Sequence, residues 1–215
     1  MTSLLRSPIA LVSGGILLSA TLVGYLAIPA EASLPIHWGV DGTADAFWPR
    51  DRALALAPVA VAVLAALSLA VARFAPQAEL QAGRHIAQVT LPGILALFAA
   101  IQAVIVLIGL GIDLPMTRVI AFSLGLLSIV VGNVLPKSQP NGLAGIRLPW
   151  TLSDAANWRA THRLAGLLMV CAGITLALLA LAMSTGPALA AATIAAMLLP
   201  VAIATLYSYR LTRRN

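Results

Sequence analysis

The segment from Gly132 to His162 concentrates the side chains best suited to specific polar recognition. It reads GNVLPKSQPNGLAGIRLPWTLSDAANWRATH and places Asn, Lys, Arg, Trp and His between two long apolar runs. Arg147 is flanked by apolar residues that would hold it at a fixed depth, and a guanidinium held that way binds phosphate or carboxylate through two hydrogen bonds at once. The segment therefore predicts a specific binding surface at the edge of a membrane.

A second stretch, residues 31–52, combines Pro and Gly with Trp and His and reads EASLPIHWGVDGTADAFWPRDR. Pro and Gly at this density predict a structured, turn-rich loop. Trp38 and Trp48 suit the headgroup layer of a membrane, where an amphipathic indole ring is favoured. We therefore expect this loop to lie at a membrane surface.

Three side chains of this loop have types that bind divalent cations or sense pH, because imidazole and carboxylate groups do both. They are His37, Asp41 and Asp45, each four residues from the next. That spacing brings side chains together only on a helix, which Gly39 and Gly42 disfavour. Turn formation and headgroup contact are the favoured interpretation, and no metal or cofactor is predicted.

The composition of the chain indicates what surrounds these two loops. Its 215 residues are 60% hydrophobic and 9% charged, with a mean hydropathy of +0.98, whereas soluble domains contain about 25% charged residues. A membrane helix needs about 20 apolar residues. The predicted fold class is all-α, a polytopic membrane protein with a bundle of about six transmembrane helices. The apolar runs are residues 8–30, 53–72, 86–112, 119–135, 164–183 and 187–209.

Several residues inside these runs affect helix geometry. Kinks without helix ends are expected at three internal prolines, Pro58, Pro92 and Pro200, because neighbouring helices can satisfy the freed carbonyls. Gly15 with Ser19, and Gly173 with Ala177, are small pairs that permit close helix approach, although chance is the favoured explanation in so alanine-rich a chain. Gln102 is the only strongly polar side chain in the middle of a run.

The Gly132–His162 segment is expected to contain a helix end and a turn. Pro136 should end the fourth helix, and the Asn133 amide should close free backbone groups or bond to a neighbouring helix. The sequence Pro140-Asn141-Gly142 predicts a turn.

A short interfacial helix is expected to follow and to continue into the fifth run. Thr151 and Asp154 match a capping-box pattern, which places the helix start near Leu152. Arg159 and Arg163 share one side, which is expected to face anionic lipid or a protein. The other side is expected in the headgroup layer and carries Trp158, Thr161, His162 and Ala165.

Lysine and arginine favour the cytoplasmic side of membrane proteins, and their distribution here orients the chain. With both termini in the cytoplasm of a bacterial cell, residues 132–163 face inward and residues 31–52 face outward. The cations then flank apolar segments, which favours lipid contact over direct nucleic-acid binding. The first run is longer than the about 7–15 residues of a signal-peptide core, so an uncleaved anchor is expected. The inner cations are Arg6, Arg73, Arg84, Lys137, Arg147, Arg159, Arg163, Arg210, Arg213 and Arg214, against Arg50, Arg52 and Arg118 outside.

The inner segment resembles the core signature of the SdpI family of bacterial membrane proteins, and the outer loop resembles a small domain of unknown function that often precedes that core. The two resemblances follow the family's order and cover nearly the whole chain. The inner signature consists of Asn133, Pro136, Lys137, Asn141, Gly145, Ile146, Arg147, Pro149, Trp150, Thr151, Leu152, Trp158, Thr161, His162 and Gly166. The outer residues are Pro35, His37, Trp38, Gly42 and Asp45.

The resemblance implies a non-enzymatic inner-membrane protein that confers immunity to a secreted toxin peptide outside and passes the signal to a transcriptional repressor inside. We expect residues 1–75 to form a two-helix unit with an extracytoplasmic loop, and residues 76–215 to form a four-helix core with the motif loop 132–163. Two alternatives stay open. The first is a transporter or channel with an unwound helix at Pro92-Gly93; the second is a membrane-embedded enzyme that pairs His37 with Asp41, or His162 with Asp154.

Overall fold

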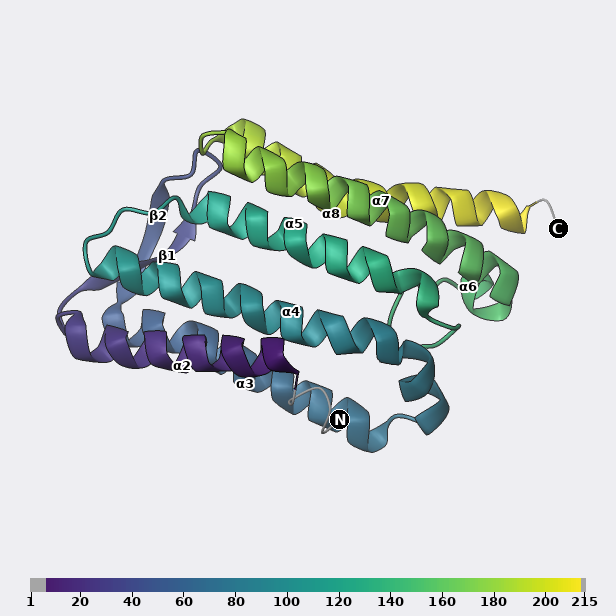
Figure 1. Ribbon diagram of the computed structural model, residues 1–215, viewed down its shortest axis with the longest axis horizontal. Coiled ribbons are helices and arrows are strands. Elements are labelled where there is room, and N and C mark those ends of the chain that lie inside the picture. The colour runs from purple at the N-terminus through teal and green to yellow at the C-terminus, as the bar shows by residue number, and fades with distance from the viewer. Residues whose placement is uncertain (1–6, 214–215) are drawn as a thin grey trace.

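The computed structural model describes residues 7–213 and consists of long helices with one β-hairpin (Figure 1). Arg6 and Arg214, two of the cations used to orient the chain, lie outside the described residues. The elements in order are α2 (Pro8–Ala27), β1 (Ser33–Trp38), β2 (Ala44–Pro49), α3 (Arg50–Phe74), α4 (Gln77–Gly109), α5 (Met116–Val134), the 3-10 turn η1 (Leu135–Lys137), α6 (Pro149–Ser153), α7 (Ala155–Ala182) and α8 (Pro187–Thr212).

Within residues 7–213, six helices are long and apolar enough to cross a membrane, namely α2, α3, α4, α5 with η1, α7 and α8. The chain is therefore a multi-pass membrane protein, and the predicted class is confirmed. Large apolar side chains are exposed along these helices, and in a bilayer they contact lipid. The helices α4 and α7 begin well before their apolar runs, at Gln77 and Ala155, because polar helical turns precede the hydrocarbon-spanning part.

The helices form a bundle with two distinct ends (Figure 1). The hairpin, the α4–α5 connection and the α7–α8 connection lie together at the hairpin end. The segment from η1 to α6 lies at the opposite end, here called the α6 end, with the α3–α4 connection and the described C-terminal end. The helix α5 packs most extensively against α7, and α2 packs mainly against α4. The division of the chain at residue 75 stays a prediction.

Residues 31–52 form an antiparallel hairpin rather than a loop of turns alone. The strands pair from Ser33 with Pro49 to Trp38 with Ala44, and the register is irregular between Pro35 and Trp38. Leu34 is buried in a cluster with residues of α3, α4 and α5. The hairpin is therefore fixed against the bundle by apolar packing, and the expectation of a structured loop is confirmed.

The internal prolines do not end their helices, since α3, α4 and α8 run through them. Pro58 has no N–H for the carbonyl of Leu54, and the fully buried Gln102 supplies the missing donor through its Nε2 at 2.9 Å. The same amide nitrogen donates to Thr21 Oγ1 at 2.9 Å. Gln102 thus joins α2, α3 and α4, and α4 is not unwound at Pro92-Gly93, contrary to the transporter alternative.

Glycine pairs explain why α5 and α7 pack so closely. A Cβ built on Gly166 would lie 2.5 Å from the carbonyl oxygen of Gly132, and one on Gly173 would lie 2.6 Å from that of Gly125. Gly173 therefore does take part in a close helix approach, and the favoured explanation of chance is wrong for that pair. Gly15 has nothing within 4 Å of such a Cβ among the described residues, which agrees with the favoured explanation of chance there.

Candidate functional site

The centre of the α6 end is a stacked pair of rings, Trp158 and His162, both 0% exposed. Their centroids are 3.9 Å apart, with an angle of 20° between the planes. The expected shared face of Trp158, Thr161, His162 and Ala165 is confirmed, because all four are buried. That face does not lie in the headgroup layer, however. The segment between η1 and α6 folds over it and excludes it from the surface, so that part of the expectation is wrong.

Backbone groups of the covering segment bind both rings. The indole Nε1 of Trp158 donates to the carbonyl oxygen of Ser138 at 3.1 Å. The Nε2 atom of His162 accepts from the N–H of Ile146 at 3.0 Å, and its Nδ1 donates to the carbonyl oxygen of Trp158 at 2.8 Å. This pattern requires a neutral imidazole with its proton on Nδ1. Both nitrogens are occupied by backbone, and His162 makes no contact with Asp154 of the kind the enzyme alternative needs.

Gly145 is the point at which the covering segment comes closest to the rings. Its φ is +116°, a backbone conformation that side chains rarely adopt. A Cβ there would lie 2.5 Å from His162 Nε2 and 3.1 Å from the Trp158 ring. Glycine is therefore required at this position for two independent reasons, the backbone angle and the missing space.

The predicted turn at residues 140–142 is confirmed, and it attaches the segment to α4. The buried Asn141 accepts hydrogen bonds from the N–H groups of Leu143 and Ala144 at 2.9 and 2.8 Å. The N–H of Gly142 donates to Glu79 of α4. The N–H of Gln139 donates to the carbonyl oxygen of Ala82 at 3.3 Å. The asparagine thus shapes the turn, and α4 holds it in place.

The capping box expected between Thr151 and Asp154 is wrong. The Oγ1 atom of Thr151 accepts from the N–H of Leu148 at 2.9 Å and donates to the carbonyl oxygen of Ile146 at 2.8 Å, so it closes the loop before α6. Asp154 instead caps α7 by accepting from the N–H of Ala156 at 2.7 Å. Its extended backbone separates α6 from α7, which gives two helices where one was expected.

A polar network that the sequence did not predict joins α8 to this end. Asn157 donates through Nδ2 to the carbonyl oxygen of Ser208 at 3.1 Å and accepts from the Ser208 hydroxyl at 2.7 Å. Trp150 donates through Nε1 to the same hydroxyl at 2.9 Å. A detectable signal existed for Asn157, which lies one turn before Thr161 and bonds to it. Ser208, which lies in an apolar run, gave no such signal in the sequence.

The remaining inner residues lie on the surface or under the turn. Arg147 is exposed, and its guanidinium donates to the carbonyl oxygen of Gly142. Lys137, with Arg159 and Arg163 of α7, is also exposed. Pro136 follows α5 within η1 as expected and packs near Gly166. Asn133 is exposed, and its side chain forms no hydrogen bond with the rest of the described chain, so its expected bonding is wrong. Pro149 is exposed at the first position of α6.

The outer candidates divide between two faces of the hairpin. His37 Nδ1 and Asp45 Oδ1 are 2.6 Å apart and exposed. Asp41 instead accepts from the N–H and the hydroxyl of Thr43, and the backbone hydrogen bond holds the pKa of Asp41 below its usual range. Across residues 7–213, no three His, Cys, Asp or Glu side chains are grouped so as to hold a metal ion, and the pairing of His37 with Asp41 is absent.

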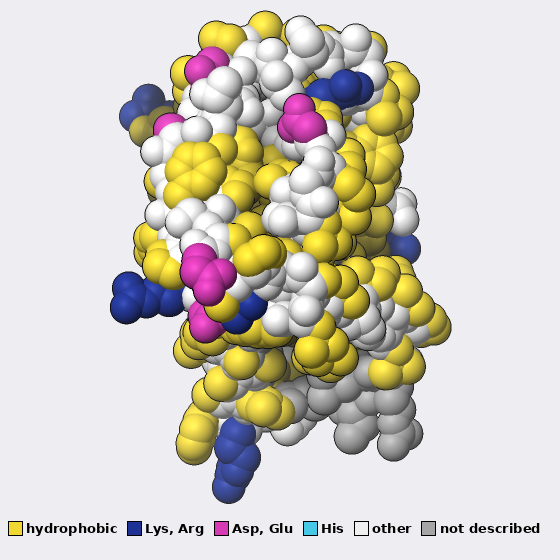
Figure 2. All heavy atoms as spheres, turned by 90° about the vertical axis from the view of Figure 1, so that its left-hand side faces the viewer, with side chains coloured by type: hydrophobic (Ala, Val, Ile, Leu, Met, Phe, Trp, Pro, Cys, Tyr) yellow, Lys and Arg dark blue, Asp and Glu magenta, His cyan; other side chains and the backbone are white. Residues whose placement is uncertain are grey.

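Pro35, Trp38 and Gly42 lie on the other face and line a pocket of about 540 Å³ at the hairpin end. The α4–α5 connection and Thr185 of the α7–α8 connection complete its walls. Gly42 has a φ of +87°, and a Cβ on it would lie 2.5 Å from Thr185. Figure 2 shows this end of the molecule, where acidic side chains lie among hydrophobic and neutral ones. The pocket, rather than the imidazole–carboxylate pair, is the concave feature of the hairpin.

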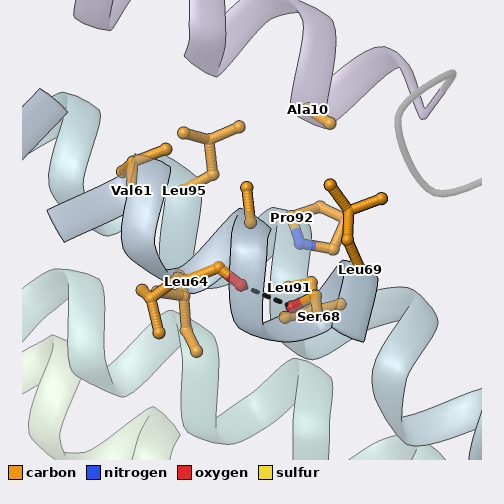
Figure 3. Close-up of a pocket in the computed structure, with 10 residues that line it drawn as sticks. Ala10, Val61, Leu64, Ser68, Leu69, Leu91, Pro92 and Leu95 are labelled. Atoms are coloured by element: carbon orange, nitrogen blue, oxygen red, sulfur yellow. Dashed lines mark hydrogen bonds between the residues drawn. The ribbon is translucent and has the colours of Figure 1, made fainter. Parts of the chain in front are cut away.

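A second cavity of about 160 Å³ lies between α2, α3 and α4 (Figure 3). Its lining is apolar apart from Ser68, whose hydroxyl donates to the carbonyl oxygen of Leu64 at 2.7 Å. A solute path needs polar groups or ionisable side chains that are free to replace water. The crevice offers none in its lining and does not support the transporter alternative.

Comparison with known proteins links the α6 end to a family. The model of the SdpI/YfhL protein family matches residues 137–208, which include the turn, α6, α7 and most of α8. Over 115 residues the chain is 33% identical to the Immunity protein SdpI of Bacillus subtilis (strain 168). That alignment covers 54% of this chain and 55% of the relative, so the chain matches about half the length of that curated protein. No solved structure matches.

The matched residues are those that build the buried contacts described above. Trp158, His162 and Gly145 lie within the matched range, as do Arg147 and the Asn157–Ser208 pair. The family resemblance inferred from the sequence is thereby confirmed. Residues 137–208, which run from the covering segment through α7 into α8, are thus similar to the SdpI/YfhL protein family.

Proposed function

We propose that this chain is a bacterial inner-membrane immunity protein that protects the cell against a membrane-active toxin peptide. The observation that carries the proposal is the similarity of 115 residues of the chain to an immunity protein. The α6 end, which lies largely in the range matched by the family model, has structural buried contacts and exposes Arg147. In this proposal the protein acts by binding, and His162 has a structural role, since both of its ring nitrogens have backbone partners.

The proposed route between the two sides of the membrane runs along α5 and α7. The helix α5 begins beside the hairpin pocket at Pro115 and ends at η1. The helix α7 begins with the ring pair and ends near Thr185, which also lines the pocket. Toxin contact at the hairpin end that favours one arrangement of this helix pair would alter the α6 end, where a transcriptional repressor would be released or bound. Arg147 is exposed there, together with Lys137, Arg159 and Arg163, whereas Trp158 is buried.

Replacing Arg147 by alanine should abolish most protection while the protein accumulates normally. A hydrogen bond from a charged group contributes about 1.5–3 kcal/mol, so we expect roughly a tenfold or larger fall in the toxin concentration that cells tolerate. Growth inhibition by the toxin peptide measures this. The Arg147→Lys variant should protect cells almost as poorly, because the ammonium group of lysine lacks the planar set of N–H donors with which a guanidinium forms two hydrogen bonds at once.

The matched control is Arg163→Ala, which removes an exposed cation of α7 outside the covering segment. It should leave protection within a factor of about two, as expected for an exposed cation that contributes 0–1 kcal/mol. Full protection by the Arg147→Ala variant at normal protein level would contradict the proposed role of this residue.

The proposed orientation can be tested with single cysteines in a Cys171→Ala background. Val40 is 68% exposed at the hairpin tip, and Gln139 is exposed at the α6 end. In intact cells a membrane-impermeant maleimide should modify Val40→Cys and not Gln139→Cys, which should react only after permeabilisation. The adjacent Ser138 is unsuitable because it is 4% exposed. Labelling of Gln139→Cys in intact cells would show that the orientation is the reverse of the one proposed.

A further inference from the structure

The pocket at the hairpin end combines aromatic walls with one charged group. Trp38 and Phe47 line it from the two strands, and Ile108 and Leu114 line it from the bundle. Asp113, in the α4–α5 connection, is the only charged residue among the lining residues. In such a pocket a carboxylate attracts a cation through hydrogen bonds, and aromatic rings attract a cation through their negative faces.

The cations nearest in sequence to this pocket already have partners. Arg50 donates to the carbonyl oxygen of Ile28 at 2.7 Å and pairs with Asp51 at 2.9 Å. Arg118 donates to the carbonyl oxygens of Ala180 and Leu181 at 2.8 and 2.7 Å. Asp113, in contrast, forms neither an ion pair nor a side-chain hydrogen bond with any residue in the described range 7–213, and it is exposed. Its carboxylate is therefore available to a ligand.

The size of the pocket limits the ligand. Its volume of about 540 Å³ is within the about 300–1,000 Å³ typical of ligand sites. This is enough for one long side chain and its immediate neighbours, and too little for a folded domain. The carbon stem of lysine or arginine suits the apolar walls, and its charged head suits the rim.

We propose that this pocket binds a lysine or arginine side chain of a peptide, with Asp113 accepting hydrogen bonds from the charged head and Trp38 and Phe47 packing against the stem. The proposal rests on the proposed function only for the choice of a peptide as ligand. It assigns a chemical class to that ligand, namely a peptide with a basic residue between apolar ones.

The test uses two short probes that differ by one charge. These are acetyl-Leu-Leu-Lys-Leu-Leu-amide and the same peptide with norleucine, which keeps the stem of lysine without its ammonium. Binding of each probe to the full chain in nanodiscs is measured by calorimetry, with empty nanodiscs subtracted. Wild type should prefer the lysine probe by about tenfold, the effect of one hydrogen bond to a charged group. Asp113→Asn should abolish that preference.

The matched control is Glu31→Gln, which removes an exposed acid at the same end outside the pocket lining and should keep the preference. Equal affinity for the two probes, no saturable binding by wild type, or an unchanged preference in Asp113→Asn would each overturn the inference. Protection of cells from the toxin peptide is measured in parallel. If the wild-type protein protects cells but does not prefer the lysine probe, the assignment of the pocket is wrong and the proposed function is unaffected. If it prefers the lysine probe but does not protect cells, the proposed function is wrong and the assignment of the pocket is unaffected.

Discussion

Alanine at position 145 should destabilise the α6 end more than any other single methyl group added to this chain. Its φ of +116° costs a side chain about 1–2 kcal/mol. The new Cβ also lies 2.5 Å from His162 Nε2, which forces the covering segment away from the rings. The N–H of Ile146 then loses its acceptor, at about 1–3 kcal/mol for an unsatisfied buried group. We expect a total loss of about 2–5 kcal/mol.

Thermal unfolding of the purified protein in detergent measures this loss, and limited proteolysis of residues 138–149 locates it. Gly111→Ala is the matched control, because Gly111 also has a positive φ, +89°, but nothing within 4 Å of its Cβ. The control should be destabilised only by the energetic cost of placing a side chain at a positive φ. Equal destabilisation by the two variants would show that contact with the rings contributes nothing.

The second large effect is expected where α5 crosses α7. Gly166→Ala would place a Cβ 2.5 Å from the carbonyl oxygen of Gly132 and 3.0 Å from Pro136, and Gly132→Ala would place one 2.7 Å from the carbonyl oxygen of Gly166. Backbone atoms cannot rotate away, so each variant must separate the helices, at about 1–3 kcal/mol. The double variant should cost less than the sum, since the first methyl group already creates the space.

The melting temperatures of the two single variants and the double variant test this expectation. Gly14→Ala is the control, because no described atom lies within 4 Å of its Cβ, and it should be neutral or slightly stabilising through helix propensity. Strict additivity of the two substitutions, or a loss as large in the control, would contradict close packing at this crossing.

The sequence was sufficient to predict what depends on hydrophobicity alone. Six spans follow from apolar length, and the face carrying Trp158 and His162 follows from helical spacing. The hairpin was not predicted as strands, because Pro35 and Gly39 gave a turn signal and the pairing of Leu34 with Trp48 depends on packing against the bundle.

The sequence identified the signature residues but did not predict how they are arranged, and their role as a functional site stays a prediction. The signature residues were identified, yet their types suggested a headgroup-facing tryptophan and a capping threonine. Trp158 and Thr151 are both buried instead, because the segment that covers them is fixed by contacts from Glu79 and Ala82, far away in sequence. Asp113 had no neighbour in sequence to mark it, since the walls of its pocket come from three separate connections. Long-range contacts of this kind leave no local pattern.

The bond between Gln102 and Leu54 has a consequence for biogenesis. During synthesis α3 leaves the ribosome before α4, and while it is alone its Leu54 carbonyl, freed by Pro58, has no donor within the helix. An unsatisfied carbonyl in hydrocarbon costs several kcal/mol, and the donor arrives only with Gln102. Release into the bilayer as a pair is therefore favoured over release one at a time, so the translocon should retain α3 until α4 has entered.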